Sequence, residues 1–212
     1  MRKLFLTMLL LAAPVLALAA TPPQPFTADY EVLRNDQRLG TGQVSLQRRG
    51  DGLFELTTRT QGTEGLAALA GVQREERSLL RWTGNGLQLV EGSMRQKAAF
   101  KTREQRVAYA GGQVDSRWKD QSARYAAPPQ VLDAHGTTAA IMAALASGQQ
   151  GTLRFPVANR SALENHRYEV AAPVRLRTAI GTERAVRVQR VREDGNGRVT
   201  KLWFARERGW LP

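Results

Sequence analysis

The sequence predicts a mainly β protein: a strongly curved antiparallel sheet, or an incomplete β-barrel, with one covering helix at about 137–147, after an N-terminal signal peptide helix. Apolar and polar residues alternate along many short segments, and Gly or Asn/Asp turns separate these segments. A single Ala-rich stretch lacks the alternation. About twelve strands with one helix favour a closed or nearly closed antiparallel sheet.

The N-terminus has the layout of a secretory signal peptide. Arg2 and Lys3 carry positive charge, residues 4–20 are apolar, and Ala17 and Ala19 are the small residues of a cleavage site. The apolar stretch is at the lower length limit for a membrane span and no charged flank follows it. We therefore expect an exported, soluble, periplasmic protein that is not an integral membrane protein after cleavage.

The chain divides into a signal peptide at 1–20, a Pro-rich spacer at 21–25 and one β-rich domain at 26–212. The sequence contains no cysteine, which excludes disulfides, thiolate metal sites and the lipid anchor of a lipoprotein. We predict no cofactor and no metal. The last residues, Gly209–Pro212, read as the entry to another strand, so we expect that the domain lacks one or more C-terminal strands.

Strands are predicted in order along the domain. In the first, Phe26, Ala28, Tyr30 and Val32 alternate with polar residues, which is typical of a half-buried strand. Further strands are expected at 40–48, 53–60, 72–82, 86–92, 94–103, 105–110, 113–119, 122–126, 151–158, 165–171, 174–180, 184–192 and 198–204.

The predicted helix is rich in Ala, Met and Leu, which are good helix formers. Thr137 or Thr138 can cap its start, and Gly148 can end it. Ile141 and Leu145 are one turn apart and should face the core.

The chain carries 31 Lys and Arg residues against 19 Asp and Glu residues, a net charge of +12. Such a balance suggests an anionic partner. Because export argues against nucleic acid, we expect a lipid or another anionic component of the envelope surface. The alternative is that the charge only keeps the protein soluble.

A basic stripe is predicted on one strand. Period two places Arg95, Lys97, Lys101 and Arg103 on one face of the segment 94–103. This stripe can bind anionic head groups. The alternative is the solvated face of an ordinary amphipathic strand.

An apolar segment bounded by glycines lies between two predicted strands, at Gly65–Gly71. It is expected to form a mobile lid, with Leu66 and Leu69 touching an apolar ligand and Phe100 contributing to the same contact. The alternative is a short helix packed over an open end of the sheet.

Asp133 and His135 form a carboxylate-x-His pair just before the helix. This pair can act in acid–base catalysis or ligate a metal. Alternatively, both residues serve the helix N-terminus, where a carboxylate meets a favourable dipole. The usual hydrolase, nucleotide-binding and zinc-protease motifs are absent from the sequence.

The order of these pieces resembles the bacterial family called domain of unknown function 3108, over roughly 26–212. The segments that carry the resemblance are Phe26–Val32, Arg38–Gly42, Val131–Asp133, Gly181–Thr182 with Ala185–Val188, Leu202–Phe204 and Leu211–Pro212. The resemblance implies an exported β-rich fold. The family has no agreed activity, so no catalytic residues are carried over.

The resulting functional hypothesis is a non-enzymatic binder of an apolar or amphipathic envelope component, such as a lipid or acyl chain. One alternative is an envelope hydrolase that uses Asp133 and His135. Another is a structural or assembly factor that binds a second envelope protein by strand addition.

Overall fold

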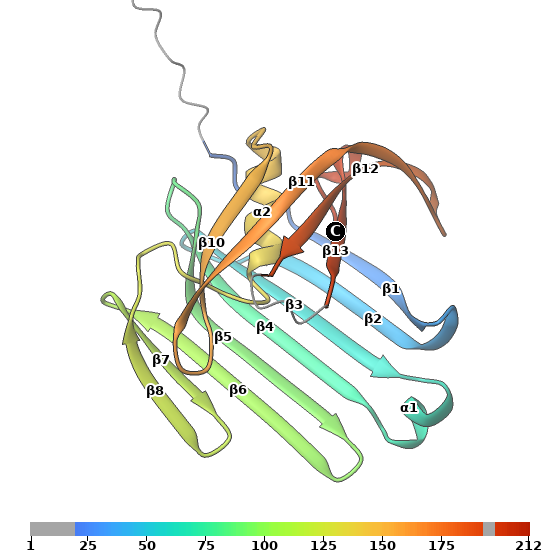
Figure 1. Ribbon diagram of the computed structural model, residues 1–212, viewed down its shortest axis with the longest axis horizontal. Coiled ribbons are helices and arrows are strands. Elements are labelled where there is room, and N and C mark those ends of the chain that lie inside the picture. Colours follow the sequence, from blue (N-terminus) through green and yellow to red (C-terminus); the bar gives the residue numbers. More distant parts are fainter. Residues whose placement is uncertain (1–19, 193–197) are drawn as a thin grey trace, which may run out of the picture.

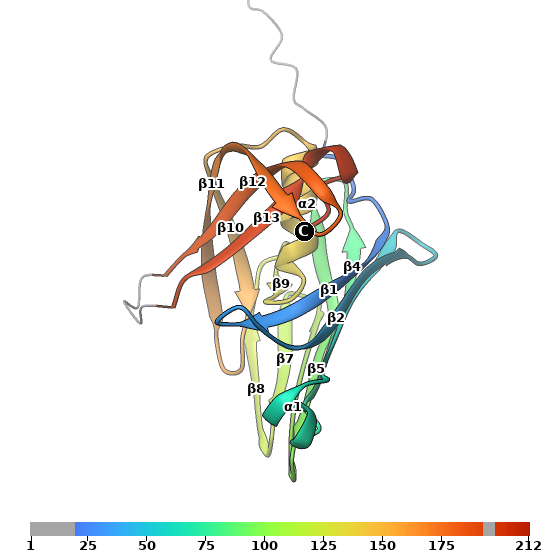
Figure 2. The ribbon, with the colours of Figure 1, turned by 90° about the vertical axis from the view of Figure 1, so that its right-hand side faces the viewer.

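The computed structural model describes residues 20–192 and 198–212. The predicted signal peptide helix lies outside these residues, apart from Ala20. The described chain is mainly β and forms two sheets around one long helix (Figures 1 and 2).

Sheet A is an eight-stranded antiparallel meander that curls into a half-barrel (Figure 1). Its strands follow one another in chain order and are joined by short turns, except where a helix intervenes after the third. They are β1 Phe26–Arg34, β2 Gln37–Arg48, β3 Leu53–Gly62, β4 Gln73–Trp82, β5 Leu87–Ala98, β6 Lys101–Ala110, β7 Gln113–Trp118 and β8 Gln121–Ala126.

Sheet B has five strands in the order β13-β12-β11-β10-β9, and only the β9–β10 pair is parallel. It covers the half of sheet A that lies away from the short helix α1 (Gly65–Leu69) (Figure 2). Its strands are β9 Leu132–Asp133, β10 Thr152–Ala158, β11 Leu163–Thr178, β12 Gly181–Val191 and β13 Thr200–Ala205. A 3₁₀ turn, η1, follows at Arg206–Arg208.

Helix α2 (Thr137–Ala146) lies between the two sheets (Figure 2). Eight of its ten residues are buried, on every side of the helix, so it belongs to the core. Small alanines let both sheets approach it closely, and Ile141 at its centre is fully buried. The predicted helix and the curved, barrel-like sheet are confirmed.

The core is one continuous cluster that draws on both sheets and α2. Leu46 and Leu56 are paired neighbours on β2 and β3, and both are fully buried. Val188 and Phe204 reach the same cluster from sheet B. The alternating pattern of the sequence thus places one face of each sheet inward.

Among the strand boundaries that differ from the sequence prediction, two affect how the sheets are built. The predicted strand 94–103 was wrong, because the chain turns at Ala99 and Phe100, and Ala99 has a positive φ of 50°. The segments 165–171 and 174–180 are largely one strand, β11, with a register shift between Val170 and Pro173 that keeps both halves paired with β12.

The last residues of the chain link sheet B to sheet A. Leu211 forms an isolated bridge with Ala205, and the Tyr30 hydroxyl of β1 donates a hydrogen bond to the carbonyl oxygen of Pro212. Within the described ranges, no helix is both long and apolar enough to span a membrane.

The first prediction tests the central position of α2. Replacing the fully buried Ile141 with Ala should lower the free energy of unfolding by about 2–5 kcal/mol, because the cavity left between two sheets cannot collapse completely. Ile180→Ala, at a side chain that is 66% exposed, is the matched control and should change it by less than about 0.5 kcal/mol. Urea denaturation measures both, and equal small effects would contradict a packed interior.

Candidate functional site

Four turns of sheet A gather at one end of the molecule, which we call the α1 end (Figure 1). They join β1 to β2, β3 to β4 through α1, β5 to β6, and β7 to β8. An antiparallel meander places every second turn at the same end, so this grouping follows from the strand order.

The α1 end displays an exposed apolar group, which we call the apolar tip and define as Leu66, Leu69 and Phe100. Their exposed fractions are 82%, 86% and 105%. The amide of Ala99 donates a 2.6 Å hydrogen bond to the carbonyl of Ala70, which ties the β5–β6 turn to the segment of α1. The three residues singled out from the sequence therefore share one end of the protein.

Backbone contacts hold α1 in place. A Cβ at Gly62 would lie 2.8 Å from Ala67, so only glycine lets α1 fold so closely against β3. The amides of Thr63 and Glu64 donate to the carbonyl of Leu39, at 3.0 and 3.2 Å. The segment is thus a short helix anchored at the sheet by its backbone, and its leucines are exposed to solvent. The role of a lid stays a prediction.

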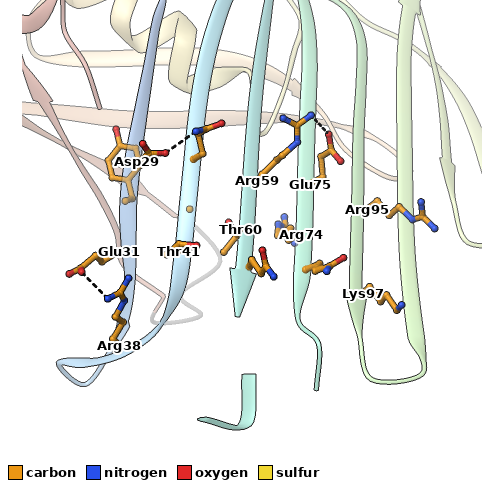
Figure 3. Close-up of a pocket in the computed structure, with 15 residues that line it drawn as sticks. Asp29, Glu31, Arg38, Thr41, Arg59, Thr60, Arg74, Glu75, Arg95 and Lys97 are labelled. Carbon is orange, nitrogen blue, oxygen red and sulfur yellow. Dashed lines mark hydrogen bonds and ion pairs between the residues drawn. The ribbon is translucent and has the colours of Figure 1, made fainter. Parts of the chain in front are cut away.

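A groove of about 850 Å³ runs across β1 to β5 beside this end (Figure 3). Strand alternation places most of its lining on the face opposite Leu46 and Leu56, so it faces away from sheet B. We call it the charged groove; its charged lining residues are Asp29, Glu31, Arg38, Arg59, Arg74, Glu75, Arg95 and Lys97.

Several of these charges are paired. Arg59 Nη2 lies 3.1 Å from Glu75 Oε1, and Arg95 lies 3.2 Å from Glu104 on the neighbouring strand. In Figure 3 the side chain of Lys97 lies at the edge of the groove nearest the β5–β6 turn. The groove therefore offers charges of both signs, and β5 contributes two cations to its lining and no carboxylate.

The basic stripe predicted from the sequence is divided between two faces. Because the chain turns at Ala99 and Phe100, Lys101 pairs with Ala98, and Arg103 pairs with Gln96. Lys101 and Arg103 therefore share the inner face with these partners, whereas Arg95 and Lys97 face the groove. The prediction of a single four-residue face was wrong, and anion binding stays a prediction.

Asp133 and His135 form a second polar cluster at the start of α2, in which Asp133 is buried and His135 is partly buried. Asp133 accepts hydrogen bonds from the Ser78 hydroxyl at 2.6 Å and from the amide of Gly136 at 3.0 Å. Ser78 Oγ also lies 2.8 Å from Nδ1 of His135, and Thr58 Oγ1 lies 2.9 Å from Nε2. The expected link between Asp133 and the helix N-terminus is present.

The hydrogen-bond donors of this cluster can be assigned. Since the single proton of Ser78 goes to Asp133, Nδ1 of His135 donates to Ser78. In the neutral imidazole, Nε2 then accepts from the Thr58 hydroxyl. Burial lowers the pKa of His135 and raises the pKa of Asp133.

This cluster resembles a catalytic trio in composition only. Ser78 is fully buried, and a Cβ at Gly92 would lie only 2.7 Å from Asp133 Oδ2, so the carboxylate sits in a closed cradle. A nucleophilic serine needs its proton taken by the histidine, whereas Ser78 gives its proton to Asp133. Throughout residues 20–192 and 198–212, no group of three His, Asp or Glu side chains is placed to hold a metal.

Ser78 and Thr58 were not singled out from the sequence. Both occupy inward-facing positions on strands whose neighbouring inward residues, Leu56 and Leu80, are core leucines. A polar residue at a core position was the available signal, but its partners come from a segment more than fifty residues away.

A family model described as "Protein of unknown function (DUF3108)" matches residues 26–212. The chain belongs to this family. The structure of this chain is also similar to the crystal structure of a β-barrel-like protein of domain of unknown function DUF1849 from Brucella abortus. That likeness has a TM-score of 0.51 and 10% sequence identity and covers 88% of each chain, so it concerns the fold alone. No curated protein matches the chain.

For this DUF3108 protein, Ser78→Ala should lower the free energy of unfolding by about 1–3 kcal/mol or more, because it leaves Asp133 and His135 short of a partner in a buried site. Ser122→Ala, at an exposed position of β8, is the control. Thermal and chemical denaturation measure the difference. Ester hydrolysis that disappears in a Ser78→Ala protein of normal stability would instead support the hydrolase alternative.

The low pKa of His135 gives a pH prediction. A histidine whose pKa in the folded state is below its unfolded value of 6.5 contributes stability above that pH, and the contribution is lost as the pH falls through the folded value. His166, whose pKa burial also lowers, acts in the same direction, whereas Asp133 acts in the opposite direction above pH 3.8. His166 and Asp133 both remain in the His135→Gln variant. This variant should therefore lose less free energy of unfolding than the parent protein between pH 7 and pH 5. Equal losses in denaturation curves would contradict the assignment.

Proposed function

We propose that this protein is an exported, periplasmic, non-enzymatic binder of an amphipathic envelope component, such as a lipid. The observation that carries the proposal is the junction of the charged groove with the apolar tip. Gln61 and Gln73 line the groove and directly flank the segment of α1. Lys97 also lines it and stands three residues before Phe100.

An amphiphile has a polar head and an apolar chain, and this junction offers a surface to each. Lys97 suits an anionic head group, and Arg59 and Arg95 suit one that takes the place of Glu75 and Glu104 as their partner. Leu66, Leu69 and Phe100 suit the chain, because burying them removes large apolar surfaces from water. The interior is occupied by α2, so we place the ligand on this surface and not inside the barrel.

The two alternative functions have less support. The hydrolase hypothesis requires a nucleophile or base that a substrate can reach, and Ser78 and Asp133 are buried. The assembly-factor hypothesis requires an exposed strand edge that a strand of another protein can pair with. It stays a prediction.

The proposal is tested by the binding of a fluorescent single-chain anionic phospholipid, used below its aggregation concentration. Replacing Arg59 and Arg95 with Ala should weaken binding about fivefold or more, since a basic residue near an anionic head group contributes about 1 kcal/mol. The control replaces the exposed Arg175 and Arg177 of β11 with Ala and should bind as the parent does. Fluorescence anisotropy gives the affinities.

Native mass spectrometry of the gently purified full chain supplies a second measurement. Co-purifying lipid would support the proposal. A protein that carries no lipid and does not bind the fluorescent probe would refute it.

A further inference from the structure

We propose that the α1 end docks, tip first, on the surface of an anionic lipid bilayer. The apolar tip enters the interface and the cations beside it reach the head groups. The inference deepens the proposed function and rests on it for the compartment in which the protein meets a membrane.

The side chains of the apolar tip are almost fully exposed to solvent. Phe100 is 105% exposed and the two leucines of α1 exceed 80%, so three large apolar side chains stand in water at one end. Leu33, at the neighbouring β1–β2 turn, adds a fourth that is 55% exposed. Exposed apolar side chains that gather at one place mark interaction sites, whereas single apolar side chains scattered over a surface are normal.

The tip is held out from the protein by its local structure. Phe100 occupies a two-residue turn between β5 and β6, whose backbones are paired up to Ala98 and Lys101. The hydrogen bond between Ala99 and Ala70 braces this hairpin against the α1 segment. The side chains therefore project from the end of a supported sheet, as insertion into an interface requires.

Cations lie on both faces of the β5–β6 hairpin, because the chain turns at Ala99 and Phe100. Lys97 lies on one face of the β5–β6 hairpin and Lys101 and Arg103 lie on the other, so cations flank Phe100 on both sides. A strand advances about 3.3 Å per residue, which places all three within roughly 10 Å of the tip along the hairpin. Interfacial side chains are buried to about 5–10 Å, so these cations would lie at head-group depth.

Two of the carboxylates near this hairpin already have a basic partner. Glu64 lies 3.4 Å from Arg38 and Glu104 lies 3.2 Å from Arg95, so both are ion-paired. A planar anionic surface can meet cations on both faces of a hairpin at once, whereas a protein partner would have to wrap around it. The geometry therefore favours a bilayer over a protein or a second copy of this chain.

Sedimentation with vesicles of phosphatidylethanolamine and phosphatidylglycerol tests the inference. We expect binding to these vesicles and much weaker binding to pure phosphatidylcholine. Replacing Leu66, Leu69 and Phe100 with Ser should reduce partitioning at least about tenfold, because burying one such side chain already exceeds the roughly 1.4 kcal/mol that tenfold represents. The matched control replaces Val174, Ile180 and Val199, which are 45%, 66% and 60% exposed elsewhere, and should bind as the parent does.

The electrostatic part has its own variant. Lys97→Glu with Lys101→Glu should weaken binding by about fivefold or more per site at low salt, and the difference should shrink as salt is added. Arg175→Glu with Arg177→Glu makes the same change in net charge on β11 and serves as the control. If both double variants weakened binding equally, the attraction would depend on net charge alone, and the proposed docking geometry would be wrong.

Insertion is measured directly with Phe100→Trp in brominated vesicles. We expect its fluorescence to be quenched, whereas Ile180→Trp, placed away from the α1 end, should not be. Failure of quenching at position 100, or vesicle binding that survives the serine variant, overturns the inference. Binding of the single-chain probe without vesicle docking would refute this inference alone. Vesicle docking by a protein that carries no co-purifying lipid and does not bind the probe would refute the proposed function alone.

Discussion

The buried hydrogen bonds of Asp133 join the separate parts of the molecule. Its carboxylate accepts from Ser78 on β4 and from Gly136 at the start of α2, while Asp133 itself belongs to β9 of sheet B. A carboxylate can be buried only if its oxygens are satisfied, so this contact specifies where α2 meets sheet A. Gly92 supplies the space, because any side chain there would collide with the carboxylate.

The regular parts of this architecture could be predicted from sequence because their causes are local. Period-two alternation indicated the strands, and the Ala-rich segment without it indicated α2. The β5–β6 turn was missed because Ala99 and Phe100 are not turn residues, and Ala99 adopts its positive φ only in the paired hairpin. The role of Ser78 was missed for a related reason, since its partners arrive from a distant segment.

In the candidate site, too, some features depend on the local sequence and others on contacts between distant segments. Leu66 and Leu69 could be singled out as apolar residues of a glycine-bounded segment, and Phe100 as an apolar residue of a predicted strand. Their meeting depends on the strand order and on one backbone hydrogen bond between two turns. Their exposure could not be predicted either. Alternation reports which residues share a face, and it carries no information on which half of a sheet the second sheet leaves uncovered.

The position of a single turn changes what the basic residues of this hairpin can do. Had 94–103 remained one strand, its four cations would have formed a stripe along one face, suited to a ligand lying flat on the sheet. With the reversal at Ala99 and Phe100, the same residues stand on both sides of a projecting aromatic ring. That arrangement complements a charged plane with an apolar layer beneath it, and in a bilayer the head groups and the acyl chains have this relation.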